Sequence, residues 1–417
     1  MFRQLALLVV ILVPFVARAE DQPILKKGDR LVIAGDSITE QKLYSRYIET
    51  YLTACHPELD LWILQLGWGG ETAGGFLGRM DFDLLAFKPT VVTTCYGMND
   101  GGYRAFDKNI GDTYRRNMNQ IIEKAKKAGA FVVVGSPGVV DSKYFGGGGE
   151  RAVVYNDNLA HLRDIAKQLA TKHNMAFANV HDAMFGVMPV AKKALGENYP
   201  IGGGDGVHPA PNGQLIMAYA FLKALNVDGN IATITIDGDR VEGSAGHKIL
   251  GHANHEIEIE SSRYPFCFSG DKKAANSARS ILPFIPFQHE LNRFVLVVKD
   301  LKADKAKVTW GPSSKTFTKE QLAKGVNLAA EFDETPFAAA FQKVDGLVAQ
   351  KQNFETTLIK QYHVGLRNLH GAVANDPEGA DALKKIAERL HAHQAELSTE
   401  TRKAVVAVKH TIKIEPE

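Results

Sequence analysis

Short apolar runs alternate with amphipathic stretches along the first half of the chain. Runs rich in β-branched residues occur at 30–34, 61–66, 90–95, 131–135 and, more weakly, 177–180. Between them apolar residues recur at helical spacing; the first such stretch places Leu43, Tyr47 and Tyr51 on one face. Strands that are apolar throughout are covered on both faces, so the pattern predicts a parallel sheet between two layers of helices.

This alternation predicts a flavodoxin-like three-layer α/β/α domain over residues 20–229. After Gly229 short alternating runs, separated by polar or glycine turns, predict a β-rich accessory region with antiparallel pairing over 230–334. Residues 335–417 are rich in Ala, Lys, Glu, Gln and Leu at helical spacing and predict a helical C-terminal region. A chain of 417 residues exceeds what one core usually holds, which agrees with more than one domain.

The first nineteen residues differ from the rest of the chain. Arg3 supplies a positive start, residues 5–16 form an apolar run, and Ala17-Arg18-Ala19 fits a small-residue cleavage site. This order is typical of a secretory signal peptide, so residues 1–19 predict a secreted or periplasmic protein. An uncleaved N-terminal anchor is the alternative. No later segment approaches the roughly 20 apolar residues that a membrane-spanning helix needs, so integral membrane association is not expected.

The composition is that of an ordinary globular protein, with 45% hydrophobic and 23% charged residues. Removing 1–19 takes away Arg3 and Arg18 and no acidic residue, which leaves 47 basic residues (49 minus 2) against 47 acidic ones. Phosphate binding needs a basic excess, so this balance argues against nucleic acid as a partner. Cys55, Cys95 and Cys267 allow at most one internal disulfide, and their spacing matches no zinc site.

Two further groups of residues invite a metal-binding interpretation. Four histidines form two short-spaced pairs, His252 with His255 and His391 with His393. The second pair has i,i+2 spacing, which faces two sides of a helix, and both pairs are interpreted as solvated surface side chains. Asp36 and Asp100 lie inside the motifs described next, and their positions indicate that they support loops. The sequence therefore predicts no metal and no cofactor.

Four short motifs follow strands of the predicted sheet. Gly35-Asp36-Ser37 follows the first strand, the segment 67–70 follows the second, the segment 97–100 follows the third, and the segment 205–209 precedes the final helix. Ligand sites in parallel sheets form outside the carboxyl ends of the strands. All four motifs are therefore expected at one end of the sheet.

The residue types in these motifs suit acyl transfer. A serine hydroxyl such as that of Ser37 is a weak nucleophile until a base takes its proton, and His208 is the candidate base. Asp205 lies three residues earlier, close enough to orient the imidazole. The backbone N–H groups of Ser37 and Gly70 and the side-chain amide of Asn99 are the candidate donors to a tetrahedral oxyanion.

The GDS tripeptide, the downstream glycine, the Gly-x-Asn-Asp tetrapeptide and the late Asp-x-x-His-Pro segment resemble the consecutive blocks of SGNH/GDSL hydrolases. The resemblance covers residues 30–226 and implies Ser37 as nucleophile and Gly70 and Asn99 as oxyanion donors. It implies His208 as the base, with Asp205 as its orienting acid. Family members include carbohydrate O-acetylesterases, lipases, thioesterases and lysophospholipases.

Each motif alone also fits an ordinary loop. For Gly70 the alternative is an ordinary loop glycine, and for Asn99 it is a turn or cap residue. For His208 it is a loop histidine that bonds to its own backbone. Their order, their placement after strands and the long separation from Ser37 to His208 favour the functional interpretation. No G-x-S-x-G occurs, so an α/β-hydrolase nucleophile elbow is absent. Gln65 departs from the family pattern, because many relatives carry Asn there.

The resemblance, together with the predicted export, implies ester hydrolysis, most specifically deacetylation of a carbohydrate, with a small-molecule or polysaccharide ester as substrate. Trp68, Tyr96 and Tyr103 lie in the motif loops and are candidates to stack on sugar rings. A lipid or aryl esterase, lysophospholipase or thioesterase is the alternative within the family. A non-catalytic carbohydrate-binding protein and an O-acetyltransferase are the alternatives from other classes.

Overall fold

The computed structural model describes residues 22–373 and 375–417, so the predicted signal segment 1–19 lies outside the described residues. Five parallel strands in the order β2-β1-β3-β4-β5 form the sheet of the N-terminal half. They are β1 (Arg30–Gly35), β2 (Trp62–Gly67), β3 (Val91–Cys95), β4 (Phe131–Gly135) and β5 (Ala176–Ala178). This order is the flavodoxin-like one. The predicted parallel sheet with helices is confirmed.

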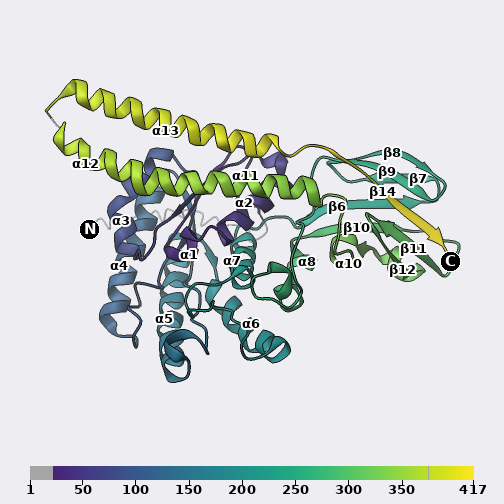
Figure 1. The fold of residues 1–417 in the computed structure, drawn as a ribbon, viewed down its shortest axis with the longest axis horizontal. Coiled ribbons are helices and arrows are strands. Elements are labelled where there is room, and N and C mark those ends of the chain that lie inside the picture. Colours follow the sequence, from purple (N-terminus) through teal and green to yellow (C-terminus); the bar gives the residue numbers. More distant parts are fainter. Residues whose placement is uncertain (1–21, 374) are drawn as a thin grey trace, which may run out of the picture.

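Helices cover both faces of this sheet (Figure 1). They are α1 (Ser37–Glu40), α2 (Tyr44–Cys55), α3 (Ala73–Asp83), α4 (Lys108–Lys127), α5 (Glu150–His173), α6 (Val180–Leu195) and α7 (Pro211–Ala224). Leu31 and Ile33 of β1 pack in a cluster with side chains of α2 and α7, whereas Val32 and Ala34 pack in a second cluster with α3 and α4. Successive residues of a strand point to opposite faces, so one apolar strand supplies both cores.

The β-rich region consists of two sheets, with strand orders β13-β10-β6-β7 and β12-β11-β14-β9-β8. Their strands are β6 (Asn230–Asp237), β7 (Arg240–Gly243), β8 (His247–Ala253), β9 (Glu256–Ser261), β10 (Arg293–Val298), β11 (Lys305–Trp310), β12 (Ser313–Thr318), β13 (Val326–Asn327) and β14 (Val408–Pro416). Short helices α8 (Phe287–Glu290), α9 (Lys319–Lys324) and α10 (Leu328–Glu331) connect them. Most pairs are antiparallel as predicted, but β10 pairs with β6 in parallel. The long connection between these two strands makes that direction possible.

The C-terminal region forms a long helical hairpin, called the arm below, that crosses the domain built on the parallel sheet (Figure 1). It contains α11 (Ala338–Thr357), the π-helical segment η5 (Leu358–His363), α12 (Val364–Ala372) and α13 (Pro377–Lys403). The helical prediction does not hold to residue 417, because β14 inserts between β9 and β11. His410, Ile412 and Ile414 alternate with more exposed residues, a period of two that fits a strand rather than a helix.

The arm closes an open edge of the parallel sheet. β2 is an edge strand, and α11 lies against it with buried polar side chains. Glu355 accepts the backbone N–H of Gln65 at 2.9 Å, and Lys351 Nζ donates to the carbonyl of Ile63 at 2.9 Å. Lys351 also forms ion pairs with Glu355 and Glu49. These contacts satisfy the outward-facing N–H of Gln65 and C=O of Ile63, and the covering helix keeps this part of the strand from pairing with another chain.

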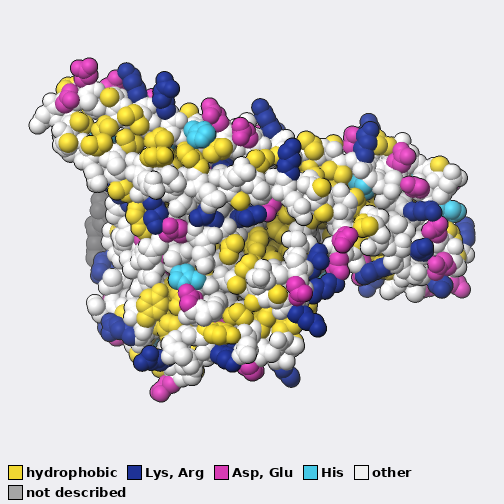
Figure 2. All heavy atoms as spheres, viewed as in Figure 1, with side chains coloured by type: hydrophobic (Ala, Val, Ile, Leu, Met, Phe, Trp, Pro, Cys, Tyr) yellow, Lys and Arg dark blue, Asp and Glu magenta, His cyan; other side chains and the backbone are white. Residues whose placement is uncertain are grey.

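The free part of the arm carries apolar side chains on its surface. Tyr362, Leu369 and Ile386 are each about half exposed, and Figure 2 shows apolar atoms gathered on the arm where it extends beyond the parallel-sheet domain. Charged side chains of both signs are scattered over the rest of that face. Within 22–373 and 375–417, no helix has both the length and the apolar character that crossing a bilayer requires.

Candidate active site

Residues 37, 205 and 208 come together at the carboxyl end of the sheet. Ser37 is the first residue of α1, directly after β1, and His208 lies in the loop before α7. Ser37 Oγ is 2.8 Å from His208 Nε2, and His208 Nδ1 is 2.6 Å from Asp205 Oδ2. The structure therefore joins in one hydrogen-bonded chain a serine and a histidine that are 171 positions apart.

The Asp205 carboxylate determines which imidazole nitrogen carries the proton. Its Oδ1 accepts the backbone N–H groups of Val207 and His208, each at 2.9 Å. Partial burial opposes the charge, but these backbone hydrogen bonds and His208 together lower the pKa of Asp205. An ionised carboxylate only accepts hydrogen bonds, so Nδ1 of a neutral His208 donates to it. Nε2 is then free to accept the Ser37 hydroxyl proton.

The turn that presents Ser37 depends on its two preceding residues. A Cβ at Gly35 would lie 2.1 Å from Thr39 Oγ1 and 2.9 Å from the Cys95 carbonyl oxygen, so no larger residue fits there. Asp36 caps α1 by accepting the N–H of Ile38 at 2.9 Å. Burial raises the pKa of Asp36 to about 7. Asp36 thus stabilises the strand-to-helix turn, in agreement with its predicted role.

The turn at residues 68–71, called the oxyanion turn below after the donor role that the sequence predicts for Gly70, lies beside Ser37. The Glu71 N–H donates to the Trp68 carbonyl at 3.2 Å, and Gly70 has a φ of 72°, the geometry of a type II turn. A Cβ built on Gly69 would be 4.0 Å from Ser37 Cβ. Among the described residues, the N–H groups of Ser37 and Gly70 donate to no protein acceptor. Both are therefore available to a ligand.

Asn99 is held in a fixed orientation next to this turn. Its Nδ2 donates to the Glu71 carbonyl at 3.0 Å, and its Oδ1 accepts the Tyr103 hydroxyl at 2.9 Å. The second N–H of the amide has no acceptor in the part of the chain that the structure describes. Asp100 joins the neighbouring loops, because its two oxygens accept the N–H groups of Ala73 and of Gly97, each at 3.0 Å.

The three motif-loop aromatics differ in what they can contact. Tyr96 is fully buried and donates to Glu71 at 2.9 Å, so the suggestion that it stacks on a sugar is wrong. The side chain follows β3 on the face that packs against α3, which a motif alone does not reveal. Tyr103 is 45% exposed, and Trp68 is partly exposed. These two remain candidates for contact with a ligand.

Sequence reasoning missed an interior network beneath the oxyanion turn. Arg79 donates to both carboxylate oxygens of Glu71, at 2.6 and 2.7 Å, and to Asp83 at 3.2 Å. All three side chains are almost completely buried. The signal available in the sequence was the spacing of Arg79, eight residues after Glu71 and four before Asp83. This spacing resembles the ordinary pattern of charged residues on a helix surface.

The predicted solvated histidines need one correction. His391 is not a free surface side chain: its Nε2 lies 3.0 Å from His363 Nε2, and its ring centroid lies 4.5 Å from that of Phe87. Burial lowers the pKa of His391 to about 4. The reason is that one side of α13 packs on the parallel-sheet domain and on α11. The three cysteines are free thiols, and no group of three or more His, Cys, Asp or Glu side chains in the described residues is arranged to hold a metal ion.

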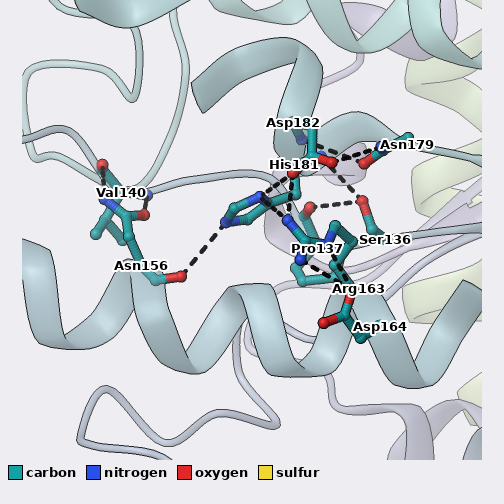
Figure 3. Close-up of polar contacts among 9 residues, drawn as sticks. All are labelled: Ser136, Pro137, Val140, Asn156, Arg163, Asp164, Asn179, His181 and Asp182. Atoms are coloured by element: carbon teal, nitrogen blue, oxygen red, sulfur yellow. Dashed lines mark hydrogen bonds and ion pairs between the residues drawn. The ribbon is translucent and has the colours of Figure 1, made fainter. Parts of the chain in front are cut away.

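A second polar cluster lies away from Ser37, at a cavity of about 620 Å³ between α5 and α6. Figure 3 shows His181, Asp182 and Arg163 pointing toward one another there. His181 Nδ1 is 2.9 Å from Asp182, which also pairs with Arg163. Ser136 Oγ accepts the His181 backbone N–H and donates to the Pro137 carbonyl, so no serine contacts the imidazole. Within the described residues, the cluster therefore has no serine–imidazole contact like that between Ser37 and His208.

Known proteins resemble the part of the chain that contains these residues. Residues 33–216 match the GDSL-like Lipase/Acylhydrolase family, a span that contains Ser37, Gly70, Asn99, Asp205 and His208. An acetylxylan esterase of Geobacillus stearothermophilus is 25% identical over 224 residues, which are 48% of this chain and 95% of that protein.

A solved structure resembles the chain over nearly its whole length. It is that of a gut microbial diltiazem-metabolizing enzyme, with a TM-score of 0.75 and 21% identity over 95% of this chain and 99% of that one. At this identity the likeness shows a shared fold. The combination of sheet, β-rich region and helical arm is therefore not peculiar to this chain.

Proposed function

Because the chain carries a domain of the SGNH/GDSL hydrolase family and is an ester-bond hydrolase, we propose that Ser37, His208 and Asp205 form its catalytic triad. The observation that carries this proposal is the continuous chain from Ser37 Oγ through the imidazole to the Asp205 carboxylate. An imidazole in contact with a serine hydroxyl and oriented by an acid is the arrangement that activates a serine nucleophile.

The proposed reaction passes through an acyl-enzyme. His208 Nε2 takes the Ser37 proton as Oγ bonds to the ester carbonyl carbon, and the carbonyl oxygen becomes an oxyanion. The N–H groups of Ser37 and Gly70 and the Asn99 amide stabilise that charge, and each fixed donor is worth about 3–4 kcal/mol. His208 then protonates the leaving alcohol. Water, deprotonated by His208, releases the acid from Ser37.

An acetylated carbohydrate is the proposed substrate, and the protein is proposed to act outside the cytoplasm. The acetylxylan esterase relative supports the choice of ester. The triad is open to large alcohols, since the side chains of His208 and Asp205 are 34% and 56% exposed. Tyr103 and Trp68 offer aromatic surface near the triad, which suits sugar rings. The apolar run at 5–16 and the small residues after it support export.

Two measurements test the proposal. A fluorophosphonate probe should label the native protein and leave Ser37→Ala unlabelled; equal labelling of both would remove the nucleophile assignment. Initial rates on acetylated xylan and on nitrophenyl esters of increasing acyl length should favour acetyl groups. A preference for long acyl chains would exclude the carbohydrate substrate while leaving the triad intact.

A further inference from the structure

The oxyanion turn is connected to the C-terminal arm through Glu40. Glu40 ends α1, three residues after Ser37. One of its carboxylate oxygens accepts the backbone N–H of Gly69. The other accepts Lys360 Nζ at 2.7 Å. A single carboxylate thus joins the nucleophile helix, the oxyanion turn and the arm.

Lys360 is placed for this contact by an irregularity of the arm. It lies in η5, the π-helical segment between α11 and α12. A π-helical turn changes the direction in which side chains leave a helix, and such turns are frequent at functional sites. Lys360 Nζ also lies 5.3 Å from the ring centroid of Trp68, the first residue of the turn. A cation at this distance from an indole adds a favourable contact.

A second connection starts from the same segment. His363 Nδ1 lies 3.2 Å from Asp83, and Asp83 accepts a hydrogen bond from Arg79 at 3.2 Å. Arg79 in turn holds the Glu71 carboxylate with two hydrogen bonds. Two side chains of η5 therefore reach the turn. Lys360 reaches Gly69, the second residue of the turn, through Glu40. His363 reaches Glu71, the last residue of the turn, through Asp83 and Arg79.

Such support has a physical purpose in an oxyanion hole. Backbone donors lower a barrier only if they are already oriented when the negative charge develops. A turn with two consecutive glycines, Gly69 and Gly70, has little conformational restraint of its own. Glu40 restrains the turn, but without a cation its carboxylate would place a negative charge next to the position where the oxyanion develops. Lys360 offsets that charge.

We propose that Lys360 is a positioning residue for ester hydrolysis, which holds the oxyanion turn through Glu40 and links the C-terminal arm to the catalytic step. The inference rests on the proposed function, in which the Gly70 N–H is an oxyanion donor. It also gives the arm a role beyond covering the edge of β2.

The test compares Lys360→Met, Lys360→Arg and Glu40→Gln with wild type in nitrophenyl acetate hydrolysis. Lys385→Met is the matched control, because Lys385 is an exposed arm lysine paired with Asp381 at 2.7 Å. We expect Lys360→Met to lower kcat about tenfold, less than the roughly hundredfold or greater loss caused by removing an oxyanion donor. KM and Tm should stay close to those of the control. Lys360→Arg should recover most of kcat, since arginine can still pair with Glu40.

The double variant Glu40→Gln with Lys360→Met gives an independent readout. If the two side chains act through one contact, the double variant should lose no more kcat than the more impaired single one. If the loss of kcat in the double variant equals the product of the two single losses, the proposed link is overturned. So would a wild-type kcat in Lys360→Met, or a loss that follows a fall in Tm and is not recovered by arginine. Wild-type protein that neither hydrolyses esters nor reacts with fluorophosphonate would instead overturn the proposed function, and this inference with it.

Discussion

The motif loops and the C-terminal arm contribute to the same site in different ways. The loops supply the groups proposed to react, among them Ser37, His208 and Asn99, each at the end of a strand or the start of a helix. The arm supplies Lys351, which binds the backbone of β2 and two buried carboxylates, and Lys360, which binds the carboxylate that holds the turn at 68–71. Reacting groups and supporting groups therefore lie in different regions of the molecule. Substitutions in the loops should change kcat, and most substitutions in the arm should change stability.

The largest expected effect is that of His208→Ala. Loss of the base leaves the Ser37 hydroxyl without a proton acceptor, so kcat should fall by about 10⁴-fold or more. Tm should change little, because His208 is partly exposed. Steady-state kinetics and thermal unfolding measure the two quantities. His252→Ala, an exposed histidine of the β-rich region, is the control. Retained activity in His208→Ala would show that this motif loop does not supply the base.

Lys351→Met should show the opposite behaviour. It leaves the buried carboxylates of Glu355 and Glu49 without their cation. Burial disfavours the charge of Lys351, but the two carboxylates raise its pKa, so the group is charged in the folded state. Removing one partner of a buried ion pair costs about 3–5 kcal/mol. Denaturant unfolding measures this loss.

Lys385→Met serves again as the matched arm variant, because its exposed ion pair is worth at most about 1 kcal/mol. Equal unfolding free energies for the two variants would contradict the role of Lys351 at the edge of β2. A large loss of kcat at a temperature where Lys351→Met is folded would show that the whole arm, and not only η5, acts on catalysis.

Asn99→Ala should reduce kcat by about 10²–10³-fold with a small change in KM, because an oxyanion donor acts in the transition state. Asn99 also donates to Glu71, so Tm should be measured beside the kinetics. Asn109→Ala, at an exposed position of α4, is the control. A rise in KM with unchanged kcat would assign Asn99 to ground-state binding instead.

The smallest expected effect concerns acid stability in the β-rich region. Ser261 Oγ lies 2.8 Å from His247 Nδ1 and 2.9 Å from His410 Nε2, and Trp310 Nε1 donates to the other nitrogen of His410. Because Trp310 can only donate, His410 donates to Ser261, which donates to His247. The hydrogen bonds that Trp310 donates to His410 and that Ser261 donates to His247 both require a neutral imidazole as acceptor.

Burial lowers the pKa of His247 to about 4 and that of His410 to about 3. Both values lie below the unfolded value near 6.5, so the unfolded state binds more protons in acid. The stability is fully present above about pH 6.5 and should fall as the pH drops toward 4, because each ring stays neutral in the folded state but takes up a proton in the unfolded state. Unfolding free energies measured between pH 7 and 4 check this. Ser261→Ala should cost about 1–3 kcal/mol at pH 7, because it leaves both rings without their shared partner.

Much of the catalytic domain followed from local pattern. The apolar runs located β1 to β4 to within a residue or two, because a strand buried on both faces has to be apolar throughout. Helix α3 gave no such signal, since Gly74, Gly75 and Gly78 lower its intrinsic helix propensity. It forms because Phe76 and Met80 are buried against the sheet. Tertiary packing outweighed the local preference there.

The C-terminal half was less predictable for a related reason. Lys351 and Glu355 are spaced like an exposed ion pair on a helix surface. Periodicity shows that a face is polar, but it does not show whether that face meets water or the edge of a sheet. The insertion of β14 next to β9, about 150 positions away in sequence, likewise left no local trace.

The sequence by itself determined which chemical groups the protein can bring to an ester and that each stands at a strand or helix end. Those properties depend on side-chain type and on hydrogen bonding between near neighbours, which short motifs record. Only the tertiary structure decided that Ser37 Oγ meets His208 Nε2 at 2.8 Å and that Lys360 reaches Glu40. Such distances result from the packing free energy of the whole chain, which is a sum over many distant contacts and is not contained in any one segment.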